Sequence, residues 1–182
     1  MATASGTSVN VWDTRSMAKS STLEGAHAMM VRDVDYNPRV PHRLVTAGDD
    51  CKIRFWDLRA GAGADPLLEL SGHSHWVWAA RFNPQHDQLV LTASSDSLVS
   101  LWKCPGASSA SSSAPGGGTP ASAPGTGAEP ADALAMSVDD HDDSVYSVAW
   151  SPVDPFAFAS LSYSGRLVVT QVPRNIKYDV LL

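Results

Sequence analysis

Apolar and polar residues alternate along three short stretches of the chain. The apolar positions are Val31, Val34 and Tyr36 in the first stretch, Val77, Ala80 and Phe82 in the second, and Val145, Val148 and Trp150 in the third. Such alternation predicts strands with one buried face. An Asn-Pro or Ser-Pro pair follows each stretch and ends the strand, because proline cannot donate to a sheet ladder. Further short strands are predicted at 43–48, 52–57 and 66–70, with equivalents downstream, so we expect an all-β fold.

The predicted strands belong to an internal repeat. LVTAGDDCKIRFWD (44–57) aligns with VLTASSDSLVSLWK (90–103), which places Trp56 and Trp102 46 positions apart. Upstream of these, AHAMMVRDVDYNP (26–38) aligns with GHSHWVWAARFNP (72–84) and with DHDDSVYSVAWSP (140–152). An earlier partial copy is TSVNVWDTR (7–15). A period of ~40–45 residues that ends in Trp-Asp, with Gly-His near its start, is typical of WD repeats, each of which forms one four-stranded blade of a β-propeller.

The repeats place a histidine, a hydroxyl residue, an aspartate and a tryptophan at fixed spacing. The two complete sets are His27, Thr46, Asp50 and Trp56, and His73, Thr92, Asp96 and Trp102. The last repeat has His141 and Ser160, but Ser164 and Thr170 stand where the aspartate and tryptophan are expected. A catalytic triad needs one strained nucleophile in a single site, whereas this set recurs in each blade. We therefore predict a structural hydrogen-bonded network.

No pattern in the sequence indicates an enzyme, a cofactor or a metal. Cys51 and Cys104 form no C-x-x-C pair, and the cluster DDHDDS (139–144) lacks the spacing of a calcium loop. A phosphate-binding glycine loop, a nucleophile elbow and zinc-type histidine spacing are also absent from the sequence. The first ten residues do not resemble a signal peptide, and no run approaches the ~20 apolar residues of a membrane span. We expect a non-catalytic cytoplasmic protein with no cofactor.

One segment interrupts the repeats. All residues from 105 to 128 are Pro, Gly, Ala, Ser or Thr, which predicts a flexible linker over 105–137 between the blades of 1–104 and the last blade, 138–182. The net charge is -6, and six of the 19 acidic residues lie in 129–143. The remaining 19 − 6 = 13 acids balance 13 Lys and Arg, so the blades carry no general basic field for nucleic acid.

Several segments resemble one family of WD-repeat proteins. They are GDDCKIRFWDLR (48–59), HSHWVWAARFNPQHDQLVLTASSDS (73–97), HDDSVYSVAWSPVDPFAFASLSYSGRLVV (141–169) and VPRNIKYDVLL (172–182). They are similar to the EARP- and GARP-complex-interacting protein family, also called the tumour-suppressing subtransferable candidate one family. The resemblance implies a non-catalytic adaptor that recruits vesicle-tethering complexes in endosome-to-Golgi retrograde transport and endosomal recycling. It also implies a location peripheral to the trans-Golgi network and endosomes. The composition of the linker departs from the family, in which the corresponding insert is more acidic.

The number of blades is smaller than the resemblance implies. A family member has about seven blades, whereas this sequence shows three blade starts and a leading fragment, about three and a half blades. We therefore expect the chain to be the C-terminal part of an incomplete seven-bladed propeller. Its first sheet edge is expected to expose unpaired strand groups and to favour aggregation.

Two surfaces are candidates for binding a protein partner. Residues that enter the first strand of each blade, or that precede its tight turn, are expected on the rim of the propeller face: Arg32, Asp49, Trp76, Trp78, Tyr146 and Tyr163. Trp, Tyr and Arg are enriched in interface hot spots, although Trp76 and Trp78 could instead pack between blades. The alternative is a W-D-x-R box with Arg15 and Arg59 as contacts, which resembles the docking element of substrate receptors of cullin-RING ubiquitin ligases. An arginine after Trp-Asp that pairs with a neighbouring carboxylate is the simpler interpretation.

Overall fold

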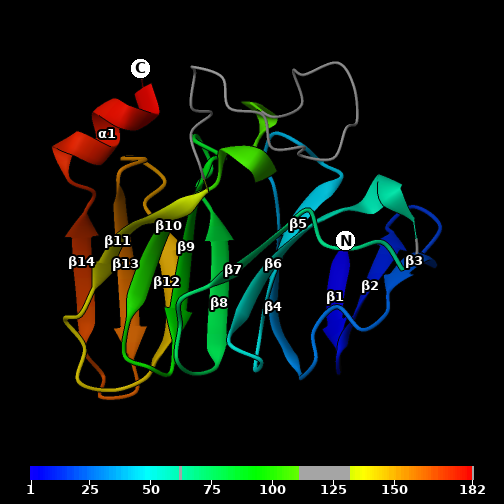
Figure 1. The fold of residues 1–182 in the computed structure, drawn as a ribbon, viewed down its shortest axis with the longest axis horizontal. Coiled ribbons are helices and arrows are strands. Elements are labelled where there is room, and N and C mark those ends of the chain that lie inside the picture. The colour runs from blue at the N-terminus through cyan, green and yellow to red at the C-terminus, as the bar shows by residue number, and fades with distance from the viewer. Residues whose placement is uncertain (62, 111–131, 182) are drawn as a thin grey trace, which may run out of the picture.

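The computed structural model describes residues 1–61, 63–110 and 132–181, which form fourteen strands in four antiparallel sheets (Figure 1). The first sheet contains β1 (Ala2–Ser5), β2 (Ser8–Asp13) and β3 (Ala18–Leu23). The second contains β4 (Val31–Tyr36), β5 (Arg43–Gly48), β6 (Lys52–Asp57) and β7 (Leu68–Ser71). The third contains β8 (Val77–Phe82), β9 (Leu89–Ser94), β10 (Val99–Lys103) and β11 (Ala133–Val138). The fourth contains β12 (Val145–Trp150), β13 (Ala157–Ser162) and β14 (Leu167–Gln171).

Each sheet is a meander, and the sheets stand side by side in chain order (Figure 1). Strand β4 contacts β1 of the first sheet and β8 of the third, and β8 contacts β12 of the fourth. The predicted strands 43–48 and 52–57 coincide with β5 and β6, and β7 begins two residues after its predicted start at position 66. The all-β WD-repeat fold class predicted from the alternation and the repeats is confirmed.

The Asn-Pro and Ser-Pro pairs make the same turn in three sheets. In each pair the first side chain accepts hydrogen bonds from the backbone N–H groups two and three residues later, at distances of 2.8–3.3 Å. The accepting residues are Asn37, Asn83 and Ser151. These short polar side chains satisfy backbone donors that a turn would otherwise leave free, which explains why the pairs end the strands.

The core lies between neighbouring sheets. Phe55 of the second sheet and Phe82 of the third are both buried and meet edge to face, with ring centroids 5.9 Å apart. Trp102 belongs to the same buried cluster, in which only 3% of its surface is exposed. The third and fourth sheets form a second cluster in which Phe158 is the largest fully buried side chain. Burial of these faces is the main stabilising contribution to the arrangement of the sheets.

The structure differs from the predicted 105–137 linker at both ends of that segment. Residues Pro105–Ala107 form a short 3-10 helix, η2, and Ser108 is buried with its carbonyl accepting from Arg43 Nη1. At the other end, β11 pairs antiparallel with β10, which makes it the outer strand of the third sheet. Without β11, the outer edge of β10 would expose unpaired N–H and C=O groups. Pairing with this edge orders β11 even though its own sequence alternates only weakly. The middle of the predicted linker, 111–131, lies outside the described residues.

A helix that the sequence did not indicate closes the described chain. This helix, α1 (Arg174–Leu181), buries only Ile176, and the carbonyl of Val180 accepts a hydrogen bond from Gln88 Nε2 at 3.1 Å. The other short helix, η1 (Leu58–Ala60), follows β6 and is capped by Asp57, which accepts from the backbone of Arg59. A helix with a single buried residue leaves little periodicity in a sequence, because one apolar position defines no face.

Candidate interaction surface

The predicted network is present in the third sheet as a chain of four side chains. Asp96 Oδ2 lies 2.9 Å from His73 Nδ1, and His73 Nε2 lies 2.7 Å from Thr92 Oγ1. Trp102 Nε1 donates to the same Thr92 oxygen at 2.9 Å. Since a carboxylate only accepts, His73 donates to Asp96 from Nδ1. The network joins the loop before β8, the turn after β9 and the strands β9 and β10 into one unit.

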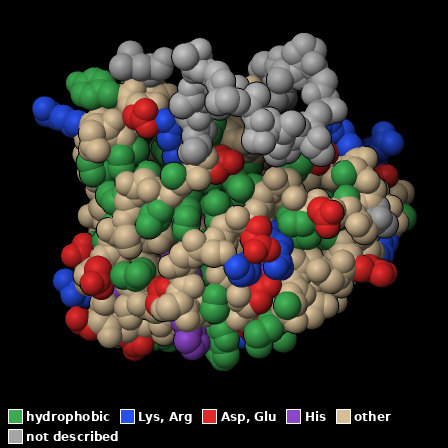
Figure 2. Space-filling view, in the orientation of Figure 1, with side chains coloured by type: hydrophobic (Ala, Val, Ile, Leu, Met, Phe, Trp, Pro, Cys, Tyr) green, Lys and Arg blue, Asp and Glu red, His purple; other side chains and the backbone are tan. Residues whose placement is uncertain are grey.

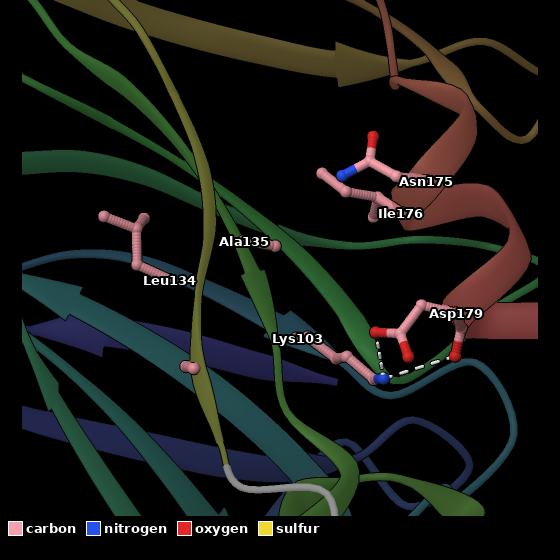
Figure 3. Close-up of a pocket in the computed structure, with 7 residues that line it drawn as sticks. Lys103, Leu134, Ala135, Asn175, Ile176 and Asp179 are labelled. Atoms are coloured by element: carbon pink, nitrogen blue, oxygen red, sulfur yellow. Dashed lines mark hydrogen bonds and ion pairs between the residues drawn. The ribbon is translucent and has the colours of Figure 1, made fainter.

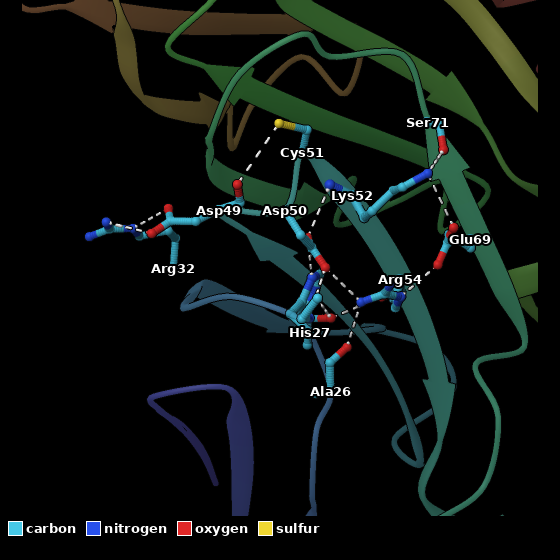
Figure 4. Close-up of polar contacts among 12 residues, drawn as sticks. Ala26, His27, Arg32, Asp49, Asp50, Cys51, Lys52, Arg54, Glu69 and Ser71 are labelled. Carbon is cyan, nitrogen blue, oxygen red and sulfur yellow. Dashed lines mark hydrogen bonds and ion pairs between the residues drawn. The ribbon is translucent and has the colours of Figure 1, made fainter.

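The second sheet repeats this network and extends it (Figure 4). Asp50 Oδ1 lies 2.7 Å from His27 Nδ1, His27 Nε2 lies 2.8 Å from Thr46 Oγ1, and Trp56 Nε1 donates to Thr46 at 2.9 Å. Arg54 adds a contact that the third sheet lacks, because its Nη1 lies 2.9 Å from Asp50 Oδ2 and its Nε lies 2.7 Å from Glu69. The leading sheet has one part of the pattern, a 2.8 Å hydrogen bond from Trp12 Nε1 to Thr3.

Burial and pairing oppose each other in the titration of these groups. Burial alone would raise the pKa of the Asp96 carboxyl, but the hydrogen bond and charge of His73 and the N–H groups of Ser74 and Leu98 hold that pKa at about 2, below its ordinary value of 3.8. Burial, together with the charge of Arg54, lowers the pKa of His27 below its ordinary value, although the hydrogen bond and charge of Asp50 oppose this shift. The His27 ring is therefore neutral at pH 7 and can accept at Nε2 while it donates at Nδ1.

The last sheet has only part of the network. His141 Nε2 lies 2.7 Å from Ser160 Oγ, as in the other sheets. However, His141 Nδ1 and Thr170 Oγ1 are buried without a hydrogen-bond partner among the described residues. Position 164, where the other repeats have aspartate, is an exposed serine whose hydroxyl lies 2.8 Å from Ser162 Oγ. The structure thus agrees with the degenerate set seen in the sequence.

A Ser164→Asp substitution is expected to stabilise the chain by about 1 kcal/mol, because it supplies an acceptor to the buried His141 Nδ1. Urea unfolding at pH 7 measures the change. Ser164→Ala is the matched control, since it removes the serine hydroxyl without adding an acceptor. Equal stability of the two variants would contradict this account of the last blade.

The six residues predicted on the rim lie together in what we call the aromatic surface, but Asp49 is only 7% exposed, so it supports Arg32 from below rather than offering a contact of its own. The aromatic surface consists of Arg32, Asp49, Trp76, Trp78, Tyr146 and Tyr163. Its rings follow one another from the third sheet to the fourth: Trp76 to Trp78 at 6.1 Å, Trp78 to Tyr163 at 6.4 Å and Tyr163 to Tyr146 at 4.7 Å between centroids. These distances lie within the range in which aromatic pairs attract each other, so the rings support one another's positions.

One end of the aromatic surface is fixed by an ion pair. Arg32 donates from Nε and Nη2 to the two carboxylate oxygens of Asp49, at 2.6 and 2.8 Å. The same guanidinium lies 4.6 Å from the centre of the Trp78 ring and 5.4 Å from that of Trp76. The hydrogen bond to Asp49 raises the pKa of Arg32 above its ordinary value. Arg32 is thus held by a carboxylate and by two rings at once, which stabilises its position.

The aromatic surface remains accessible. Tyr163 is 61% exposed, Trp76 38% and Tyr146 36%, whereas Trp78 is half-buried and donates to Ser95 Oγ at 2.6 Å. Trp78 therefore both contacts the fourth sheet and remains partly exposed. At the lower edge of the molecule, Figure 2 shows hydrophobic side chains beside a histidine, with acidic side chains to their left.

Sequence reasoning missed three residues that shape this region: Met29, Asp33 and Asp35. Met29 is 49% exposed in the loop that leads to Arg32, as is its neighbour Met30, which the repeat alignment places on the rim, and the two extend the apolar area. Asp33 and Asp35 of β4 accept hydrogen bonds from the backbone N–H groups of Ala80 and Phe82 in β8, both at 3.0 Å. Burial raises the pKa of both carboxyls. The repeat alignment held a signal for this pair, because the aspartates align with Ala79 and Arg81 of the next copy.

The alternative docking residues lie at the opposite end of the sheets. Arg59 follows β6, whose last residue, Asp57, pairs with the first residue of β5, far from the turn that carries Asp49. Its guanidinium donates from Nε to Asp57 Oδ1 at 3.0 Å and from Nη2 to Asp57 Oδ2 at 2.6 Å. At Arg15 only the backbone N–H donates to the aspartate, Asp13, at 2.9 Å. The pairing of the arginine side chain with a neighbouring carboxylate is therefore seen at Arg59.

A cavity of about 530 Å³ lies between β11 and α1 (Figure 3). Its charged lining residues, Lys103 and Asp179, form an ion pair with each other. Leu134 and Ile176 contribute apolar wall. The cavity therefore offers no free charge to a ligand from these two residues.

In the described residues we find no group of three or more His, Cys, Asp or Glu side chains placed to hold a metal. No helix in residues 1–61, 63–110 and 132–181 is long and apolar enough to span a membrane.

Comparison with known proteins gives a consistent family match. Residues 1–102 match the EIPR1 β-propeller family, and residues 133–170 match the WD domain, G-beta repeat. The chain is 46% identical over its full length to EARP and GARP complex-interacting protein 1 of Rattus norvegicus and covers 48% of that protein. It is 39% identical to EARP-interacting protein 1 of Caenorhabditis elegans, over 87% of the chain and 44% of the relative. It is 43% identical to the WD repeat-containing protein DWA2 of Arabidopsis thaliana, over 94% of the chain and 46% of the relative. The chain thus spans about half the length of these curated relatives.

Proposed function

The chain belongs to the EIPR1 β-propeller family, and on that basis we propose that it is a non-catalytic adaptor that binds subunits of the EARP and GARP vesicle-tethering complexes. The names of several relatives state an interaction with these complexes. The proposed cellular role is recruitment in endosome-to-Golgi retrograde transport and endosomal recycling, at the cytoplasmic side of the trans-Golgi network and endosomes. The relatives are about twice as long as this chain, so their binding properties enter here as part of the proposal.

The observation that supports this function best is the aromatic surface. Exposed tryptophan and tyrosine side chains bury a large area at low cost in conformational entropy, and they dominate the energetics of many protein interfaces. Three sheets contribute to this surface, and the histidine networks and the Asp33 and Asp35 contacts hold its loops in place. A preorganised aromatic surface lowers the cost of binding a partner.

Binding of purified EARP and GARP complexes to the immobilised chain tests the proposal. Trp76→Ala and Tyr163→Ala are expected to weaken binding about tenfold or more each, because both side chains are exposed and their loss removes contact area. Arg59→Ala is the matched control, since Arg59 is 64% exposed at the other end of the sheets. Thermal unfolding checks that the variants remain folded.

The control also separates the two proposed functions. If binding of the complexes is unaffected by Trp76→Ala and Tyr163→Ala, the aromatic surface is not the docking site. If Arg59→Ala instead removes binding to the adaptor of a cullin-RING ligase, the W-D-x-R alternative is favoured. The ion pair with Asp57 gives no support to that alternative, because the Nε and Nη2 donors of the Arg59 guanidinium already bind the Asp57 carboxylate.

A further inference from the structure

The three loops that lead into β4, β8 and β12 lie on the same end of the sheets and differ in character. The first reads Ala-Met-Met at 28–30 and the second Ser-His-Trp at 74–76. The third, Asp139 to Asp143, has four carboxylates around His141. The face therefore changes from apolar through aromatic to acidic across neighbouring blades.

The acidic loop adjoins the tyrosine pair of the aromatic surface. The carbonyl of Ser144, directly after the loop, accepts from the backbone N–H of Tyr163 at 3.0 Å. The Ser144 hydroxyl donates to the carbonyl of Ser95 at 3.4 Å, which ties the same loop to the turn beneath Trp78. Tyr146 follows two residues later at the start of β12 and lies 4.7 Å from Tyr163. A group seated on the two tyrosines would thus lie beside the end of the acidic loop.

The charges on this face are not balanced. Arg32 is neutralised by Asp49 and occupies the tryptophan end. At the other end, Arg166 lies 3.4 Å from Asp142, and both side chains are more than half exposed. Asp139, Asp140 and Asp143 are exposed, and no ion pair to them occurs among the described residues. The face therefore keeps a negative potential beside electron-rich rings.

We propose that the tyrosine end of the aromatic surface and the acidic loop together bind a protein segment through a Lys or Arg side chain. The cation would rest against Tyr146 and Tyr163, within reach of the loop carboxylates, while apolar residues of the segment cover Trp76 and the exposed methionines. Carboxylates and ring faces both attract a cation, so the two features of the face select the same chemistry. This inference rests on the proposed function, because it specifies the kind of segment that the same surface recognises.

Two synthetic peptides of equal length test the preference directly. They share the same apolar residues and differ in carrying either two lysines or two glutamates. Binding to the full chain is followed by tryptophan fluorescence, since Trp76 and Trp78 lie in the surface. The lysine peptide is expected to bind about tenfold more tightly than the glutamate peptide, and added salt should reduce the difference. Equal binding, or tighter binding of the glutamate peptide, overturns the inference.

Reversing the charge of one residue in the acidic loop tests whether the loop causes the preference for the lysine peptide. Asp140→Lys is expected to weaken binding of the lysine peptide about tenfold, and Asp65→Lys, the same change at an exposed loop residue outside the aromatic surface, is expected to leave it unchanged. An equal response of the two variants overturns the inference. If only the proposed function is wrong, the result is different. The EARP and GARP complexes then do not bind, but the preference for the lysine peptide and its loss in Asp140→Lys are still measured.

Discussion

Replacing Trp102 by alanine is expected to lower the free energy of unfolding by about 4 kcal/mol, within the range measured for large aromatic residues removed from protein cores. Trp102 is 3% exposed, belongs to the core cluster between the second and third sheets, and donates to Thr92. The substitution leaves a cavity and removes one member of the network. Urea unfolding monitored by circular dichroism measures the loss.

Trp12→Ala is the matched control for this prediction. Trp12 makes the same kind of hydrogen bond, from Nε1 to Thr3, but it is only half-buried in the leading sheet. Its removal is expected to cost about 1–2 kcal/mol, since less apolar area leaves water on folding at that position. Equal losses for the two variants would mean that burial between sheets is not what makes Trp102 important.

Asp96→Asn is expected to destabilise the chain by roughly 2 kcal/mol at pH 7. The Asp96 side chain is 5% exposed, and its pKa is about 2 in the folded chain against an ordinary value of 3.8. A carboxyl whose pKa falls by this amount on folding stabilises the folded state by roughly 2 kcal/mol once it is ionised in both states. Asparagine keeps the shape of the side chain but loses the charge that His73 and two backbone N–H groups recognise.

The pH dependence follows from the direction of the pKa shift. Below its unfolded pKa, the carboxyl binds more protons in the unfolded chain than in the folded chain, so its contribution is complete above about pH 4 and is lost between about pH 4 and pH 2. Urea unfolding at pH 7 and at pH 3 should therefore show a smaller difference between wild type and Asp96→Asn at the lower pH. Asp65→Asn, at an exposed position, serves as the control. A difference that stays constant as the pH falls would exclude the charged network as its source.

The repeats explain why so much of the fold was predictable. One aligned copy supports the next, so β5, β6 and the two complete histidine networks follow from spacing alone. The rim positions were also predictable, because the first strand of each blade starts at the same point of the repeat. Contacts between repeats were harder to predict from the sequence. The position of Arg32 over Trp78 and the hydrogen bonds of Asp33 and Asp35 to β8 depend on how neighbouring sheets are placed.

The segments that the sequence did not indicate are those that depend on a distant partner. Strand β11 pairs with β10 across the interrupting segment, and its sequence, ALAMSV, has little alternation of its own. Helix α1 is held by the buried Ile176, by one hydrogen bond from Gln88 and by two hydrogen bonds from Lys103 to Asp179. In both cases tertiary contacts, rather than local propensity, determine the structure.

Site-specific photo-crosslinking tests most directly whether the aromatic surface is the docking site. A photoreactive phenylalanine derivative replaces either Tyr163 or Tyr178, which are 61% and 62% exposed and lie on the aromatic surface and on α1, respectively. Each variant is then irradiated together with purified EARP or GARP complex. The account predicts a covalent adduct with a complex subunit from position 163 and little or none from position 178. An adduct from position 178 alone would contradict it.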